Sequence, residues 1–212
     1  MQKFGMHPVR LSRSQLYYLE MKNVIILGAS GNIAKHVIDI LVKKDYINLT
    51  LFLRDKTRLS NKDISKCRII EGNVLEYNQL KEAVKGQDIV YVNLAGDLEQ
   101  MAKNIVKAME ETGVKRIIVI SSIGIYETPL RPVLKPYRKL ADVIEASNLD
   151  YTILRPTWFT NDNEVDYEIT RKGEPEKGSV ISRKSIATFI VNIIGVPEKY
   201  VRENLGVNKP NS

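Results

Sequence analysis

Apolar residues along the chain gather into short continuous runs, and these runs alternate with longer segments in which apolar residues recur at helical spacing. The run Val24–Leu27 is typical of a buried strand, the segment 28–31 of a tight glycine turn, and the segment from Ile33 to Lys44 of an amphipathic helix. The same alternation predicts further strands at 49–53, 67–70, 88–92, 116–120 and 151–154, and further helices at 77–84, 98–112, 137–147 and 182–194.

Most of these strands are apolar on both faces, which is typical of a parallel sheet covered by helices on two sides. The pattern therefore predicts the α/β class, with a Rossmann-type doubly wound parallel sheet in a single domain. After Pro156 the pattern loosens, and we expect only a strand within 164–171 and a short one at 179–181. Residues 1–20 show no strong period, so we interpret them as an N-terminal extension and place the domain, with a small substrate-side segment at its C-terminal end, at 21–212.

Composition and charge limit the kinds of ligand and partner that the protein is expected to bind. The net charge of +7 favours anionic ligands, but the 32 basic and 25 acidic residues are interspersed, which argues against nucleic acid. One cysteine and two distant histidines give no cluster suited to a metal ion, so none is expected. No apolar run approaches the roughly 20 residues that a bilayer requires, so we expect no membrane partner. A lone cysteine fits a reducing, cytoplasmic location.

Polar or small residues follow nearly every predicted strand. The carboxyl ends of parallel strands meet at one edge of a sheet, where ligands of such sheets bind. We therefore expect the residues at these positions to line one rim: Gly28, Arg54, Asn73, Asn93 to Gly96, Ser121, Ser122, Arg155 and Pro156.

The turn between the first strand and the first helix is suited to a phosphate. The first helical N–H groups lack intrahelical partners and carry the positive end of the helix dipole. Gly28 allows a sharp exit from the strand, and Gly31 allows close approach of a ligand, as in dinucleotide-binding turns. The candidate cofactor-binding residues here are Gly28, Ala29, Ser30, Gly31, Asn32 and Ile33.

Arg54 lies at the end of the second strand, where the chain meets the ribose of a bound dinucleotide. An acid at this place favours the ribose hydroxyls of NAD, and a base favours the phosphate of NADP. Asp55 would favour NAD if it pointed inward. The neighbouring Lys56 and Arg58 favour NADP(H) over NAD(H).

Five segments in fixed order resemble the atypical short-chain dehydrogenase/reductases, in particular their NmrA-like, NAD(P)H-binding branch. They are GASGNIA at 28–34, EGNV at 71–74, VKRIIVISSIGIY at 114–126, ASNLDYTILRP at 146–156 and ISRKSIATFI at 181–190. The resemblance implies a Rossmann fold and preference for NADPH.

The resemblance also implies further contacts with the cofactor. Asn73 and Val74 stand where the family brackets the adenine, although Asn73 also suits a turn. Leu94, Ala95 and Gly96 would let the backbone pass close to the cofactor, with helix entry as the alternative for Gly96. Pro156 and Ser121 join this set, and Lys139 stands near the place of the lysine that holds the ribose.

Catalytic members of this superfamily pair a serine with a Tyr-x-x-x-Lys helix, whose tyrosine donates a proton to the substrate carbonyl. Ser121 or Ser122 can supply the serine. The spacing of the dyad is absent, because Tyr137 is followed four residues later by Ala141. Tyr137, and Tyr126 on the preceding loop, remain candidate acids.

Two functions follow from this departure. One is an oxidoreductase that uses NADPH to reduce a small acceptor, namely a flavin, quinone, other aromatic compound or carbonyl, against a platform of Trp158, Phe159 and Tyr126. The other is a non-catalytic redox sensor of the NmrA type that reports its bound cofactor to a protein partner. A homodimer is a further expected assembly.

Overall fold

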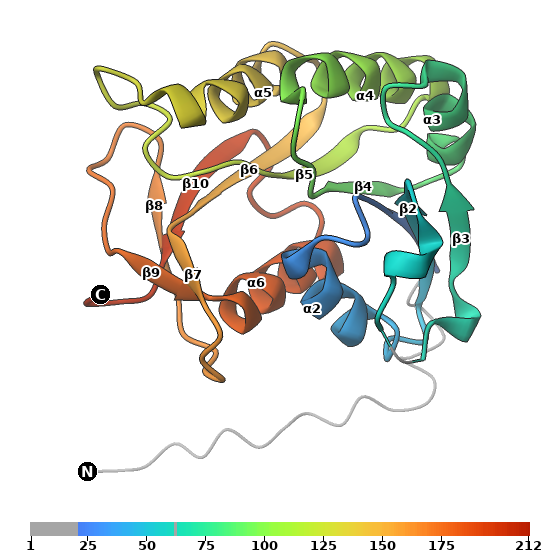
Figure 1. Cartoon of the computed structure of the whole chain (residues 1–212), viewed down its shortest axis with the longest axis horizontal. Helices are drawn as coiled ribbons and strands as arrows, with labels where there is room; N and C mark the ends of the chain where they lie inside the picture. The colour runs from blue at the N-terminus through green and yellow to red at the C-terminus, as the bar shows by residue number, and fades with distance from the viewer. Residues whose placement is uncertain (1–20, 62) are drawn as a thin grey trace.

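The computed structural model describes residues 21–61 and 63–212, so the expected extension at 1–20 lies outside the described residues. Eight strands form one sheet in the order β3-β2-β1-β4-β5-β6-β10-β8 (Figure 1). The strands are β1 (Lys22–Leu27), β2 (Ile47–Leu53), β3 (Arg68–Glu71), β4 (Ile89–Val92), β5 (Arg116–Ile120), β6 (Asp150–Pro156), β8 (Glu168–Arg171) and β10 (Glu203–Asn208). The predicted doubly wound Rossmann-type sheet is confirmed, with its switch point between β1 and β4.

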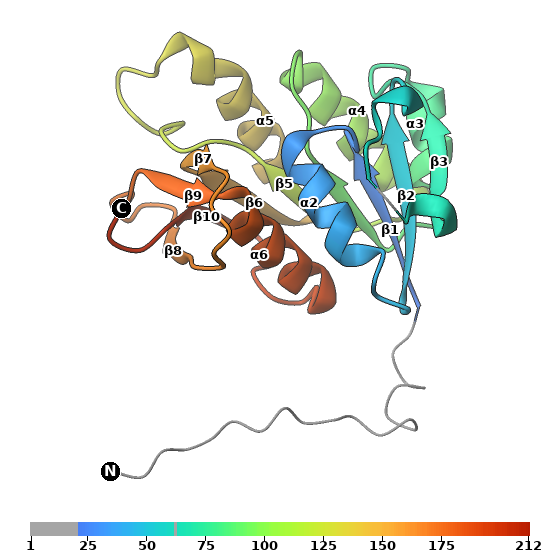
Figure 2. The ribbon, with the colours of Figure 1, turned by 60° about the horizontal axis from the view of Figure 1, so that its bottom comes forward.

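Within residues 21–61 and 63–212, five α-helices cover the two faces of the sheet. They are α2 (Asn32–Leu41), α3 (Tyr77–Val84), α4 (Leu98–Thr112), α5 (Lys135–Glu145) and α6 (Arg183–Gly195). The helices α2 and α6 pack together on one face, and α4 lies between α3 and α5 on the other (Figures 1 and 2).

The two cores follow from the alternation of side chains along each strand. In β1, Val24 and Ile26 are buried against α2 and α6, whereas Ile25 and Leu27 are buried on the side of α3, α4 and α5. Each such side chain contributes roughly 1.5–3 kcal/mol when fully buried. A strand that is apolar on both faces is therefore stable only between two helical layers.

The segment after Pro156 contains structure that the sequence did not predict. The last strand, β10, lies between β6, to which it is parallel, and β8, to which it is antiparallel. A small second sheet pairs β7 (Trp158–Thr160) with β9 (Val180–Ser182). The expected strand within 164–171 is confined to β8, and one strand of the expected parallel sheet is antiparallel.

The strand β6 extends to Pro156, two residues beyond the predicted end at 154. Pro156 is the last residue of the strand and pairs in register with Val207 of β10. Its missing N–H is tolerated at a strand end, and its carbonyl accepts a hydrogen bond from the Ile123 N–H at 3.1 Å. This bond ties β6 to the loop that follows β5.

In the part of the chain that the structure describes, no helix combines the length and apolarity that a membrane crossing needs. The same residues contain no group of three or more His, Cys, Asp or Glu side chains that could hold a metal ion.

Gly206 of β10 tests the packing of the unpredicted strand. A Cβ at this position would lie 2.4 Å from Thr170 Oγ1 of β8. We expect Gly206→Ala to lower the free energy of unfolding by about 1–3 kcal/mol because the strands must separate. Gly195→Ala is the matched control, since a Cβ at Gly195 meets no heavy atom within 4 Å. Urea denaturation measures both, and equal stability of the two variants would contradict tight packing of β10 on β8.

Candidate functional site

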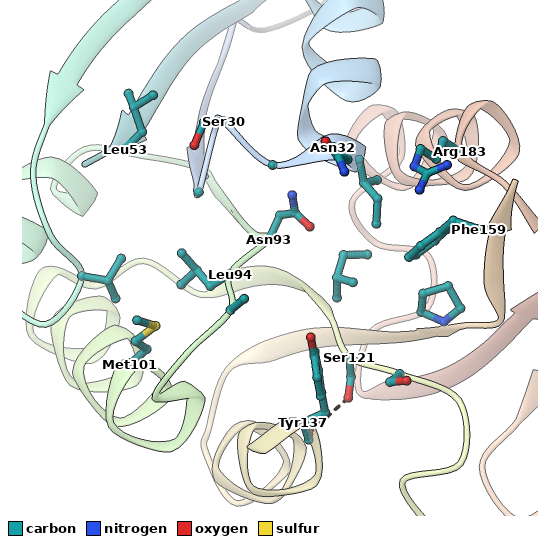
Figure 3. Close-up of a pocket in the computed structure, with 18 of the residues that line it drawn as sticks. Ser30, Asn32, Leu53, Asn93, Leu94, Met101, Ser121, Tyr137, Phe159 and Arg183 are labelled. Atoms are coloured by element: carbon teal, nitrogen blue, oxygen red, sulfur yellow. Dashed lines mark hydrogen bonds between the residues drawn. The ribbon is translucent and has the colours of Figure 1, made fainter. Parts of the chain in front are cut away.

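A cavity of about 560 Å³ opens at the carboxyl ends of the parallel strands. It runs from the β1–α2 turn and the end of β2 to the loop after β5 and the segment after β6 (Figure 3). Most of the residues predicted from the sequence to bind a cofactor line it: Gly28, Ser30, Gly31, Asn32, Ile33, Arg54, Asn73, Val74, Leu94, Ala95, Ser121 and Pro156.

The glycine turn lies directly against the end of β4. A Cβ at Gly28 would lie 2.2 Å from the Asn93 carbonyl oxygen, and Gly28 has a φ of +86° that side chains disfavour. A Cβ at Gly31 would lie 2.1 Å from Asn93 Nδ2. A side chain at position 31 would therefore displace the Asn93 amide before it met any ligand. The Asn93 side chain projects between the turn and the cavity (Figure 3).

Two arginines at the end of β2 line the cavity. Arg54 and Arg58 are exposed and form no ion pair with residues 21–61 or 63–212. Asp55 lines the cavity beside them. The Thr57 hydroxyl and backbone N–H both donate to Asp55 Oδ1 and lower the pKa of this carboxyl. Lys56 pairs with Glu71 at 3.2 Å. Of the three cations near this strand end, the two arginines remain available to an anion.

The residues that follow β3 and β4 form a partly apolar wall. Val74, Leu94 and Ala95 line the cavity, and so does Asn73. The side-chain oxygen of Asn73 accepts a hydrogen bond from the Leu75 N–H at 3.1 Å, so Asn73 also shapes the turn. Gly96 is exposed and does not line the cavity, and the buried Ala29 lies behind the glycine turn.

Ser121, Ser122 and Tyr137 meet at the end of β5. The Ser121 hydroxyl donates to the backbone carbonyl of Tyr137 at 3.2 Å, and the Tyr137 ring extends its hydroxyl into the cavity (Figure 3). The Ser122 hydroxyl donates to the Ile123 carbonyl at 3.1 Å. The structure therefore brings the two candidate serines and one candidate tyrosine to the same wall.

Tyr126 does not join them. Its hydroxyl donates to Glu145 at 3.1 Å and accepts from Asn204 at 2.7 Å, outside the residues that line the cavity. Burial, and next the Glu145 carboxylate, raise the pKa of Tyr126. A phenol held in this way is poorly placed to donate a proton to a ligand in the cavity.

Arg155, expected at the rim, is instead 1% exposed. Its Nε donates to Glu176 at 2.9 Å and its Nη1 to Asn204 Oδ1 at 2.8 Å. The other Glu176 oxygen accepts from the Gly124 N–H at 2.9 Å. Arg155 therefore does not face the cavity. It supports the loop that carries Ser121, because Glu176 connects Arg155 to that loop.

Lys139 also points away from the cavity. It pairs with Glu99 of α4, which raises the pKa of Lys139, while Lys103 and Lys139 together lower the pKa of Glu99 to about 2. Ala141, at the lysine position of a Tyr137-based dyad, is buried. Neither residue offers a cation beside Tyr137.

Asn93 lines the cavity, as its position after a predicted strand led us to expect, although it was not among the residues predicted to bind the cofactor. Arg183 begins α6, and no sequence pattern places its guanidinium at the site. The lining residues that were not predicted include Leu53, Met101, Leu134, Thr157 and Arg183.

Residues 28–197 match the family model described as NAD(P)H-binding. The chain therefore belongs to this NAD(P)H-binding family. The matched segment contains both the glycine turn and the segment after β6, so it spans the whole cavity. The resemblance to the atypical short-chain dehydrogenase/reductases is confirmed.

Solved structures agree with this assignment. A Rossmann-fold NAD(P)-binding family protein from Shigella flexneri is 48% identical, with a TM-score of 0.84 over 91% of this chain and 96% of that one. A short-chain dehydrogenase/reductase from Veillonella parvula in complex with NADP is 29% identical, with a TM-score of 0.82 over 90% and 95% of the two chains. Cinnamoyl-CoA reductase 1 from Arabidopsis thaliana is 29% identical over 74% of this chain, which spans about half (49%) of that reductase.

The clearance between Gly31 and Asn93 gives a direct test. We expect Gly31→Ala to weaken NADPH binding about tenfold or more, because the new methyl group drives the Asn93 amide into the cavity. In a double-mutant cycle measured by NADPH fluorescence, the loss should shrink when Asn93→Ala is already present. Strictly additive losses would instead show that Gly31 matters through the ligand alone.

Proposed function

We propose that the chain is an NADPH-dependent reductase of a small, flat acceptor such as a flavin, a quinone or another conjugated carbonyl compound. The observation that carries this proposal is the continuity of one cavity from the glycine turn to a wall containing Tyr137 and Phe159. Such a cavity accommodates a dinucleotide at one end and an acceptor at the other.

The residues present fit the cofactor. The turn at 28–31 is a cradle that side chains at Gly28 and Gly31 would fill, and a diphosphate needs such an approach to helix N–H groups. Arg54 and Arg58 would hold the additional phosphate of NADPH, and Val74 and Leu94 would contact the adenine side. With these placements, the end of β2 is the part of the cavity that would distinguish NADPH from NADH.

The other end supplies alignment and exclusion of water. Bound NADPH supplies a hydride, which carries two electrons, and the reduced acceptor then takes up one proton. Phe159 offers an apolar face to a flat acceptor, and the exposed Trp158 lies at its rim. Tyr137 is the candidate proton donor, with water as the source for acceptors such as quinones that need little acid catalysis.

A redox sensor is the second candidate. It is favoured by the lack of a lysine four residues after Tyr137, where Ala141 is buried, and by the pairing of Lys139 with Glu99. Catalytic members of the superfamily place a lysine at that position to assist the tyrosine, and this chain has none there. A protein with this site would bind NADPH and report it to a partner.

Turnover separates the two candidates. We expect loss of absorbance at 340 nm when the protein is mixed with NADPH and a panel of flavins, quinones and small carbonyls. Gly31→Asp should abolish it, with circular dichroism as the control for folding. Tyr137→Phe should slow carbonyl acceptors more than quinones. Tight NADPH binding without oxidation by any acceptor would refute the reductase and favour the sensor.

Cofactor preference tests the arginines at the end of β2. We expect NADPH to bind at least about tenfold more tightly than NADH, and Arg54→Ala or Arg58→Ala to reduce that ratio, because charge-assisted hydrogen bonds contribute about 1.5–3 kcal/mol. Lys56→Ala is the matched control, since Lys56 already pairs with Glu71. Titration calorimetry with both cofactors gives the ratio. Equal affinities, unchanged in the arginine variants, would overturn the preference for NADP(H).

A further inference from the structure

Arg183 brings a further cation to the cavity, at the end away from Arg54. Arg131 also lines the cavity, but it pairs with Glu127 at 3.8 Å. Arg183 is the first residue of α6, it is half-buried, and its guanidinium carbon lies 5.5 Å from the centre of the Phe159 ring. Figure 3 shows the guanidinium next to Phe159, on the side of the cavity opposite Tyr137. The cation and the apolar wall therefore belong to one subsite.

The hydrogen bonds of Arg183 fix its orientation and leave donors available. Nη1 donates to the Thr160 carbonyl at 3.2 Å and to Asn161 Oδ1 at 2.7 Å. A guanidinium has five N–H donors, so those on Nε and Nη2 have no partner among the described residues. Nε and Nη2 together form the fork that binds a carboxylate or phosphate through two parallel hydrogen bonds.

The charge of Arg183 is also not neutralised. Within residues 21–61 and 63–212 it forms no ion pair, and both of its acceptors are uncharged oxygens. The neighbouring Lys184 likewise donates only to uncharged oxygens, those of Asn163, but it does not line the cavity. A half-buried cation with a prepared fork and no carboxylate partner is suited to a ligand anion.

We propose that this subsite selects an anionic acceptor: a flat conjugated ring packed on Phe159, with a carboxylate or phosphate substituent bound by Arg183. The proposal rests on the proposed reductase function and names its acceptor class. It differs from the role of Arg54 and Arg58, which lie at the opposite end and would contact the cofactor.

The test uses binding, so it does not depend on turnover. Protein saturated with NADP⁺ is titrated with FMN and with riboflavin, which share one ring system and differ by a phosphate, and flavin fluorescence is followed. Anthraquinone-2-carboxylate and its carboxamide form the matching carboxylate pair. We expect the charged member of each pair to bind about tenfold more tightly.

Arg183→Gln should remove this preference and leave NADP⁺ affinity in the absence of acceptor within about twofold. Arg183→Lys should retain part of it, because the charge remains and the fork is lost. Lys184→Gln, the matched control, should retain all of it.

Equal binding of the charged and neutral probes, or no binding of either charged probe, overturns the proposal. So does a loss in Arg183→Gln that falls on NADP⁺ instead of on the charged probe, since Arg183 would then serve the cofactor. Charge discrimination without turnover supports the anionic subsite and refutes only the reductase. Turnover without charge discrimination supports the reductase and refutes the anionic subsite.

Discussion

The contact between the β1–α2 turn and the end of β4 is the constraint on which the site depends. The Asn93 N–H donates to the Leu27 carbonyl at 2.9 Å, so the end of β4 is bonded to β1 where the glycine turn begins. The connections of these two strands cross opposite faces of the sheet, which opens the crevice between their ends. A Cβ at 28 would meet the Asn93 carbonyl oxygen, and a Cβ at 31 would displace the Asn93 side-chain amide. The place where a diphosphate would lie is thus space that no side chain occupies.

The opposite wall is held by a different kind of interaction. The buried Arg155 is bonded to Glu176 and Asn204, and Glu176 also accepts from the Gly124 N–H. A buried guanidinium is costly unless its donors are satisfied, so these partners must lie in defined positions around it. The network therefore sets the loop after β5, and through it Ser121, by a requirement for charge and hydrogen-bond satisfaction instead of by apolar packing.

The features that could be predicted are those that depend on short stretches of sequence. The apolar runs of β1, β4 and β5 and the glycine turn predict the sheet, its rim and the cofactor class. By contrast, β10 was missed because its polar residues are buried: Asn204 serves Arg155, and Asn208 donates to Glu168 at 2.8 Å. The resemblance predicted Tyr126 and Lys139 at the site. Their side chains instead bind Glu145 and Glu99, which are distant in sequence. Periodicity carries no information about such partners.

The position of β10 between β6 and β8 affects how the chain folds as it is synthesised. Synthesis runs from the N-terminus, so β1 to β6 and α2 to α5 are made before β10. The edge of β6 stays open until residues 203–208 are made, since β10 is its only other neighbour in the described sheet. An open edge is a template for pairing with other chains. The strands beside the glycine turn are therefore complete before β10, whereas the β6 side of the sheet stays unfinished until that strand is made.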